Sequence, residues 1–172
     1  MAIVQIFSMR NNSHTFLADW AIKFIKNKDI IAKKIEQIEN RKDGFDLYVK
    51  YKDKEQYVII APKIIDMGSI IQRLNNDFYF SIVTLNSKGN FEIILKSWSK
   101  LINFKFLSLI FVNPFSELDK KWIVFPYIHN RICDESSLES GLKAMFNMVE
   151  PIEEEQLIAK LQAKQYDLPY EP

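Results

Sequence analysis

The residues best suited to chemistry in this 172-residue chain lie in the short segment 125–135, which contains His129, Arg131, Cys133 and Asp134. A cysteine acts as a nucleophile when its thiolate lies within hydrogen-bonding reach of an imidazole, and a separation of four residues requires the segment to turn helically. An imidazole and a carboxylate are also metal-ligand types. One hypothesis is that His129, Arg131 and Asp134 bind a small molecule.

Such a site needs a concave pocket with nearby aromatic walls, for which the sequence offers Trp122, Phe125 and Tyr127. The alternative interpretation is structural. In that case His129 and Arg131 hydrogen-bond loop carbonyls, Asp134 serves the start of the next helix, and Cys133 packs as a small apolar residue. The residue types alone leave both interpretations open.

A second candidate set is formed by Asp46, in the middle of a predicted strand, and Lys63, at the end of the next one. Asp66 or Gln72 on the following predicted helix adds a third oxygen ligand. Divalent cations take several oxygen ligands, and metal ions activate phosphate esters. The sequence thus predicts a catalytic set of Asp46, Lys63 and Asp66, with Asp46 and Asp66 as metal ligands. The alternative is that Asp46 belongs to the polar face of a half-buried strand.

Over about residues 14–63, a predicted helix followed by three strands resembles the PD-(D/E)XK superfamily of metal-dependent nucleases. The resemblance implies Mg²⁺ or Mn²⁺ held beside a phosphate by an acid on one strand and an acid-x-Lys on its neighbour. This chain departs from that pattern in Ala61-Pro62-Lys63, where Ala61 stands in place of the second acid. The expected activity under this hypothesis is therefore that of a degenerate nuclease or phosphodiesterase.

Basic and aromatic residues alternate in Lys50-Tyr51-Lys52, with Tyr48 and Tyr57 close by in the predicted hairpin. Rings that stack on bases and lysines that contact phosphates form nucleic-acid surfaces of this kind. A hairpin that simply presents tyrosine and lysine to water has the same sequence. Charge is unevenly distributed as well, with twelve basic and eight acidic side chains over 1–63 and six basic and eleven acidic over 116–172.

The usual signatures of nucleotide cradles, nucleophile elbows and zinc helices are absent from the sequence. A single cysteine excludes an intramolecular disulfide and every site that needs two thiolates. We therefore expect a non-catalytic module that binds a macromolecule, either another protein or itself. No cofactor is expected, and Mg²⁺ or Mn²⁺ is needed only under the nuclease alternative.

In the N-terminal half, apolar residues at helical spacing after Asn12-Ser13 predict a helix over 14–27. The segment 29–40 fits either a helix or a strand, and we favour a strand. Asp43-Gly44 predicts a turn. The remaining expected elements are strands over 45–51 and 57–61, paired as a hairpin, and a helix over 64–74.

In the C-terminal half, Ser136 and Glu139 form a capping-box pattern that predicts a helix start. Pro151, followed by three glutamates, predicts a last helix that ends at about Gln165. The other expected elements are strands over 77–85, 104–112 and 122–125, a turn over 86–90 and a helix over 91–102.

These elements predict an α/β (α+β) fold: a mixed, mostly antiparallel sheet with an N-terminal β-meander, flanked by about five helices. We expect one globular domain over 1–172 with a short flexible tail over 166–172. With 26% charged residues and no apolar run long enough to span a bilayer, the expectation is a soluble protein without a membrane span. The N-terminus lacks the pattern of a secretory signal, so the expected location is cytoplasmic.

Overall fold

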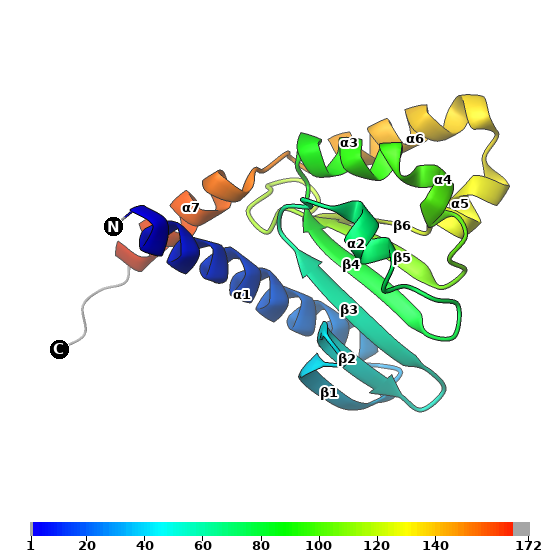
Figure 1. The fold of residues 1–172 in the computed structure, drawn as a ribbon, viewed down its shortest axis with the longest axis horizontal. Helices are drawn as coiled ribbons and strands as arrows, with labels where there is room; N and C mark the ends of the chain where they lie inside the picture. The colour runs from blue at the N-terminus through cyan, green and yellow to red at the C-terminus, as the bar shows by residue number, and fades with distance from the viewer. Residues whose placement is uncertain (1, 167–172) are drawn as a thin grey trace.

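A computed structural model describes residues 2–166 of the chain, with side chains described over 13–163. Its centre is one six-stranded sheet whose strands lie side by side in chain order, β1 to β6 (Figure 1). Pairings β1–β2, β2–β3 and β5–β6 are antiparallel, and β3–β4 and β4–β5 are parallel. The strands are β1 (Ile35–Lys42), β2 (Phe45–Tyr51), β3 (Glu55–Ala61), β4 (Tyr79–Leu85), β5 (Leu107–Val112) and β6 (Lys121–Val124).

Helices cover both faces of this sheet. One face carries α2, α3, α4 and α6, and the other carries α1 and α7. The described helices are α1 (Ala2–Asp29), α2 (Met67–Ile71), α3 (Lys88–Lys96), α4 (Trp98–Leu101), α5 (Pro126–Ile132), α6 (Glu135–Asn147) and α7 (Glu154–Tyr166). The predicted α+β fold with a mixed sheet and an N-terminal meander is confirmed.

The meander is fixed by local sequence. Asp43 and Gly44 connect β1 to β2 with φ angles of 54° and 79°, which is the left-handed backbone that a two-residue hairpin turn requires. Glycine adopts this conformation without the steric cost of a Cβ atom. The turn predicted at Asp43-Gly44 and the hairpin that follows it are therefore confirmed.

Two apolar clusters form the core, one on each face. On the face under α1 and α7, Leu17 and Leu157 are fully buried against strand residues such as Val58 and Val83. On the opposite face, Phe80 and Phe111 are equally buried beneath α3 and α6. Strand 45–51 was expected to have one buried face, but Tyr48 is only 4% exposed on the side opposite Leu47. Both faces of the strand are buried because helices cover both faces of the sheet.

Several element boundaries differ from the sequence expectations. Ser13 does not cap a helix but lies inside α1, where its side chain is completely buried. Within 29–40, only the part from Ile35 onward is a strand. The polar run 86–90 is the start of α3, because the hydroxyl of Ser87 caps that helix. The helix expected over 64–74 is shortened to α2.

The helix expected over 91–102 is divided into α3 and α4, and α5 adds to the five expected helices. Helix α5 occupies residues for which a loop was expected, and Pro126 begins it. No helix within residues 2–166 combines the length and the apolar character that crossing a membrane requires. The predicted tail over 166–172 lies outside the described residues, except for Tyr166, which ends α7.

Candidate functional site

Asp46 lies at the start of β2 and is held by two neighbours. Its Oδ1 lies 2.8 Å from Nε2 of His14 on α1, and its Oδ2 accepts a 2.7 Å hydrogen bond from the backbone N–H of Ile60 on β3. Because a carboxylate only accepts hydrogen bonds, Nε2 of His14 carries the proton in this contact. Asp46 therefore joins α1, β2 and β3.

This pairing shifts both pKa values. The hydrogen bond to Asp46 raises the pKa of His14 above its ordinary value, against the opposing effect of burial. Burial raises the pKa of Asp46, but the hydrogen bonds from His14 and Ile60 and the charges of His14 and Arg73 outweigh it, so the net shift is downward. Asp46 is thus held ionised, as a metal ligand or an ion-pair partner must be.

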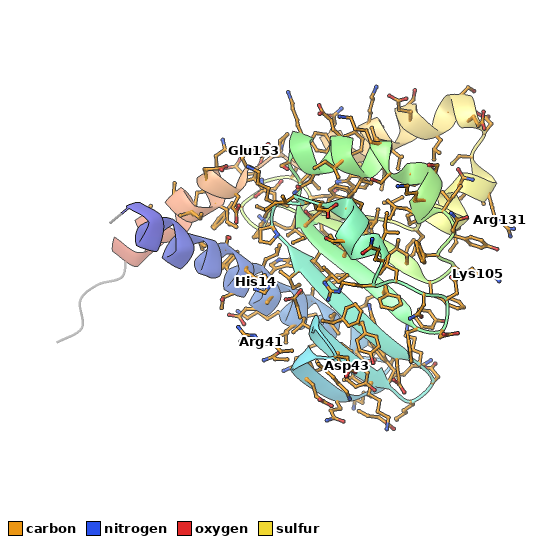
Figure 2. The ribbon with its side chains drawn as sticks, viewed as in Figure 1. His14, Arg41, Asp43, Lys105, Arg131 and Glu153 are labelled. Carbon is orange, nitrogen blue, oxygen red and sulfur yellow. The ribbon has the colours of Figure 1, made fainter. Side chains whose placement is uncertain are left out.

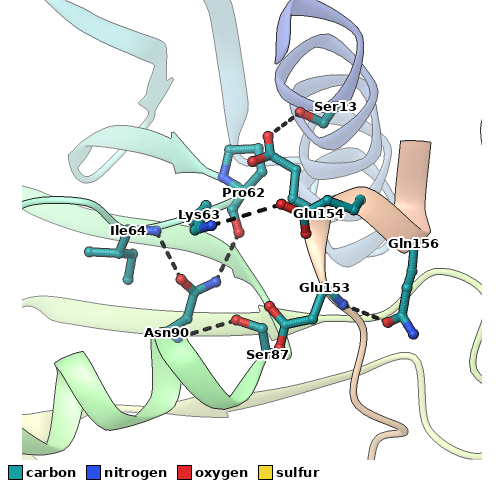
Figure 3. A network of polar contacts seen from close by, with 10 residues as sticks. Ser13, Pro62, Lys63, Ile64, Ser87, Asn90, Glu153, Glu154 and Gln156 are labelled. Atoms are coloured by element: carbon teal, nitrogen blue, oxygen red, sulfur yellow. Dashed lines mark hydrogen bonds and ion pairs between the residues drawn. The ribbon is translucent and has the colours of Figure 1, made fainter. Parts of the chain in front are cut away.

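Lys63 and Asp66 have other partners. The ammonium of Lys63 lies 3.8 Å from a carboxylate oxygen of Glu155 at the start of α7, and both side chains are more than half exposed. Figure 3 shows Lys63 beside this acidic segment, where Glu154 accepts a 2.6 Å hydrogen bond from Ser13 of α1. Asp66 accepts a hydrogen bond from the backbone of Gly68 and so caps α2.

The three members of this predicted catalytic set therefore have separate roles in the fold. Asp46 is paired with His14, Lys63 with Glu155, and Asp66 caps a helix. Within the described part of the chain, no group of three His, Cys, Asp or Glu side chains is arranged to hold a metal ion.

The second predicted set, on α5 and at the start of α6, is also engaged locally. Nδ1 of His129 lies 3.0 Å from the carbonyl oxygen of Phe125, and the two rings are nearly parallel. The Arg131 guanidinium lies over the ring of Tyr127. Asp134 accepts hydrogen bonds at the start of α6 and caps that helix. No contact among the described residues joins His129, Arg131 and Asp134 to one another.

A cavity of about 740 Å³ lies between α1, the sheet and α5, and sequence reasoning expected only two of its lining residues in a pocket. Of the three aromatic residues expected to form a pocket, Phe125 and Tyr127 line this one, whereas Trp122 is buried on the other face of the sheet. His129, Arg131 and Asp134 are not among its lining residues. The other aromatic lining residues are Phe24, Tyr51, Tyr79, Phe80 and Phe106.

Four neighbouring strands, β2 to β5, each contribute one polar side chain to a hydrogen-bonded row on the floor of the cavity. Tyr51 donates a hydrogen bond to Gln56 Oε1 at 3.0 Å, and Gln56 Nε2 donates to the hydroxyl of Ser81 at 2.6 Å. The hydroxyls of Ser81 and Ser108 are 2.6 Å apart. We call these four residues the polar row. The sequence signal for it is a polar residue within each of β3, β4 and β5, all of which are otherwise mostly apolar.

Lysines surround the cavity, and both of its acidic side chains already accept hydrogen bonds from other groups. Asp53 accepts a hydrogen bond from Lys34 at 2.7 Å, and the Asp29 carboxylate caps two backbone N–H groups after α1. The ammonium of Lys54 lies 4.6 Å from the centre of the Tyr79 ring. Lys28 and Lys105 also line the cavity, without an ion-pair partner among the described residues. The cavity therefore carries an excess of positive charge.

The interleaved tyrosines do not form the expected nucleic-acid surface. Tyr48 and Tyr57 are 4% and 8% exposed, with ring centres 5.2 Å apart in the core. Lys50 is paired with Glu36, and Tyr51 points into the cavity as part of the polar row. Two of the three rings are thus unavailable for stacking on bases.

The two candidate regions lie far apart. Neither His14 nor Asp46 lines the cavity, and Figure 2 shows His14 at a distance from Lys105, which does line it. A ligand in the cavity would therefore not contact Asp46. Comparison with known proteins found no matching family model, no matching curated protein and no matching solved structure.

Proposed function

We propose that this protein is a non-catalytic interaction module that acts by binding another protein. The observation that supports the proposal is a row of exposed apolar side chains along α5 and its N-cap residue: Phe125, Ile128 and Ile132, which we call the α5 strip. These residues are 38%, 47% and 71% exposed. A cytoplasmic location belongs to the same proposal. Disulfide bonds form in oxidising compartments, and a chain with one cysteine cannot form an intramolecular disulfide.

The spacing of the α5 strip distinguishes it from ordinary surface exposure. Single exposed apolar residues are common in folded proteins. Positions 125, 128 and 132 instead fall on one side of a helix, because residues three and four apart are neighbours on its surface. Phe106, which is 39% exposed, lines the same cavity as Phe125 and Ile128 and extends the apolar surface. Contiguous apolar surface of this kind is typical of interaction sites.

The charges beside the α5 strip favour a second copy of the chain as the partner. Arg131 lies within the helix, and Asp134 and Glu135 follow it directly. In a two-fold pair each patch meets its own copy, so positive and negative groups at one patch can face their opposites across the axis. A partner of one charge sign would satisfy only one or two of these three groups.

Sedimentation velocity over a range of concentrations tests this proposal. We expect a concentration-dependent dimer that Ile132→Asp abolishes, because a carboxylate in an apolar contact is desolvated without a partner. Ile65→Asp is the matched control, since Ile65 is 78% exposed outside α5. A chain that stays monomeric at every concentration, or an equal loss of dimer in both variants, contradicts a second copy as the partner.

A different protein partner is then tested by placing a photo-crosslinking amino acid at position 132 and, as the control, at position 65. A discrete product formed only from position 132 would support binding of another protein through the α5 strip. Equal products from both positions, or none, in a chain that is also monomeric would overturn the proposal.

A degenerate metal-dependent nuclease or phosphodiesterase is the second candidate. It is favoured by the ionised Asp46 at the start of β2, within the helix-and-meander order that resembles the PD-(D/E)XK superfamily. A melting-temperature titration with Mg²⁺, Mn²⁺ and Zn²⁺ tests it, because a ligand that prefers the folded state raises that temperature. A rise that Asp46→Asn removes and Glu36→Gln preserves would support a metal site at Asp46. No rise at millimolar metal would contradict this candidate.

A further inference from the structure

We infer that the cavity between α1, the sheet and α5 binds a flat organic anion, with its rings against the aromatic walls and its anionic group among the lysines. The cavity shares Phe125 and Ile128 with the α5 strip, but the inference does not depend on the proposed protein-binding function. The size of the cavity is the first argument. At about 740 Å³ the cavity falls within the range of roughly 300–1,000 Å³ that is typical of small-molecule sites.

The walls indicate the shape of the ligand. Tyr79 and Phe106 form a tilted ring pair with centres 4.6 Å apart, and both line the cavity. Phe24 on α1 and Phe125 at the start of α5 add aromatic surface from two other elements. Aromatic side chains favour offset stacking or edge-to-face contact with another ring. A flat ring system therefore matches these walls better than a branched or strongly polar molecule.

The electrostatics indicate the charge of the ligand. Asp53 is neutralised by Lys34, and Asp29 is occupied with backbone N–H groups. The lysines left without a carboxylate partner among the described residues are Lys28, Lys54 and Lys105. They lie on α1, before β3 and before β5, so positive charge approaches the cavity from three directions. An anion is attracted there, and a cation is repelled.

The polar row supplies donors at the floor. Ser81 accepts from Gln56, and either of the Ser81 and Ser108 hydroxyls can donate to the other, so one hydroxyl proton of the pair is not used between them; for Ser108 the other acceptor within reach is the carbonyl oxygen of Phe80, at 3.4 Å. Gln56 Nε2 also carries a second proton, with no acceptor among the described residues. Burial, with a smaller contribution from the charge of Asp29, raises the pKa of Tyr51 to about 12, so its phenol remains a donor and keeps the row oriented. A ligand oxygen at the floor would be met by these donors.

Isothermal titration calorimetry with three probes that share one ring system tests this inference. The probes are 2-naphthoate, the neutral 2-naphthylmethanol and the cationic 2-naphthylmethylammonium. We expect saturable binding of naphthoate, weaker binding of the alcohol by about fivefold or more, and no measurable binding of the amine. Raising the salt concentration is expected to weaken naphthoate binding only, because ions screen the lysines.

Two variants test whether naphthoate binds in the cavity. The double substitution Lys54→Gln with Lys105→Gln is expected to reduce naphthoate affinity by about fivefold or more and to leave the alcohol unchanged. Lys88→Gln is the control, because this exposed lysine begins α3 on the other face of the sheet. Ser108→Ala removes the last hydroxyl of the polar row and should weaken both the acid and the alcohol.

The inference is overturned if naphthoate does not bind at millimolar concentration, if the alcohol and the amine bind as well as the acid, or if the double variant and Lys88→Gln behave alike. The comparison of the three probes uses the unaltered chain, so it decides the matter even if a variant fails to fold. An unaltered chain that stays monomeric but binds naphthoate would contradict only a second copy as the protein partner, whereas a chain that dimerises but does not bind naphthoate would contradict this site alone.

Discussion

Nε2 of His14 lies 2.8 Å from Oδ1 of Asp46 and joins the helix α1 to the strand β2 across 32 positions of the chain. The second carboxylate oxygen binds the backbone N–H of Ile60, beyond the last β2–β3 residue pair of the ladder, Leu47 with Val58. Asp46 thus replaces a missing ladder acceptor and also anchors α1. The structural role and the metal-binding role proposed above both require an ionised Asp46.

The His14–Asp46 pair should make stability depend on pH. The pKa of His14 is raised in the folded state, so its contribution is complete below pH 6.5 and is lost as the pH rises through the folded pKa. The pKa of Asp46 is lowered, so its contribution is present above pH 3.8 and is lost as the pH falls through the folded pKa. The pair therefore stabilises the fold most between these limits.

We expect His14→Gln to reduce the free energy of unfolding more at about pH 5.5 than at about pH 8.5, by roughly 0.5–1 kcal/mol. The value is small because the side chains of His14 and Asp46 are 39% and 27% exposed. Urea denaturation at the two pH values measures it. His129→Gln is the control, since this histidine contacts only its own helix start. A pH-independent difference would show that the pair is not charged in solution.

Leu157 tests the docking of α7 on the sheet. Its side chain is fully buried in the cluster beneath α1, together with Leu17 and Ile152. Leu157→Ala should lower the free energy of unfolding by about 2–5 kcal/mol, because it removes apolar contacts and leaves a cavity. Leu118→Ala, at a position 63% exposed, should change it by less than about 0.5 kcal/mol. Similar values for the two variants, measured by urea denaturation, would mean that α7 is not packed in solution.

Asn90 is the most densely hydrogen-bonded side chain in the core. It accepts from the N–H of Ile64 and donates to the carbonyl oxygens of Pro62 and Leu85 and to the hydroxyl of Thr84, at 2.7–3.0 Å, and it is 1% exposed. Figure 3 shows it between the end of β3 and the start of α3. It therefore fixes the loop that carries Lys63.

Asn90→Ala is expected to lower the free energy of unfolding by about 2–4 kcal/mol, because several buried polar groups lose their partners at once. Asn130→Ala is the comparison, since Asn130 is an exposed asparagine whose side chain accepts only from Trp98. Chemical denaturation at neutral pH measures both. A small effect at Asn90 would imply that water replaces the lost partners.

The meander was predictable because its determinants are local. Asp43-Gly44 fixes the turn, and the alternation from Phe45 to Tyr51 defines a strand. Helix α5 was missed because the residues after the strand expected over 122–125 were interpreted as a loop, whereas a proline such as Pro126 is favoured as the first residue of a helix. Ser87 and Asn90 were interpreted as turn residues for a similar reason, since the residues that favour turns also cap helices.

The candidate sites were harder to predict than the meander, because their residues are distant in the sequence and meet only in the folded chain. Asp46 was identified by residue type, but its partner His14 lies on a distant helix and no spacing rule connects them. The cavity was not predicted because its lining comes from α1, five strands or their ends, and α5, over a span of more than one hundred residues. Ser81 and Ser108 did carry a signal, as isolated polar residues in buried strands. That signal gains meaning only when the parallel pairing of β4 and β5 places them side by side.

The polar row makes a prediction of its own, based on non-additivity. Ser81 is 2% exposed, accepts from Gln56 and contacts Ser108, so Ser81→Ala should cost about 1–3 kcal/mol of stability by leaving partners unsatisfied. Ser108→Ala alone should cost less, because Ser108 is only half-buried. The double variant should cost less than the sum of the two single variants, since the hydroxyl-to-hydroxyl bond is lost only once. Urea denaturation of all four proteins completes the cycle. Strict additivity would show that the two hydroxyls do not interact and that the row ends at Ser81.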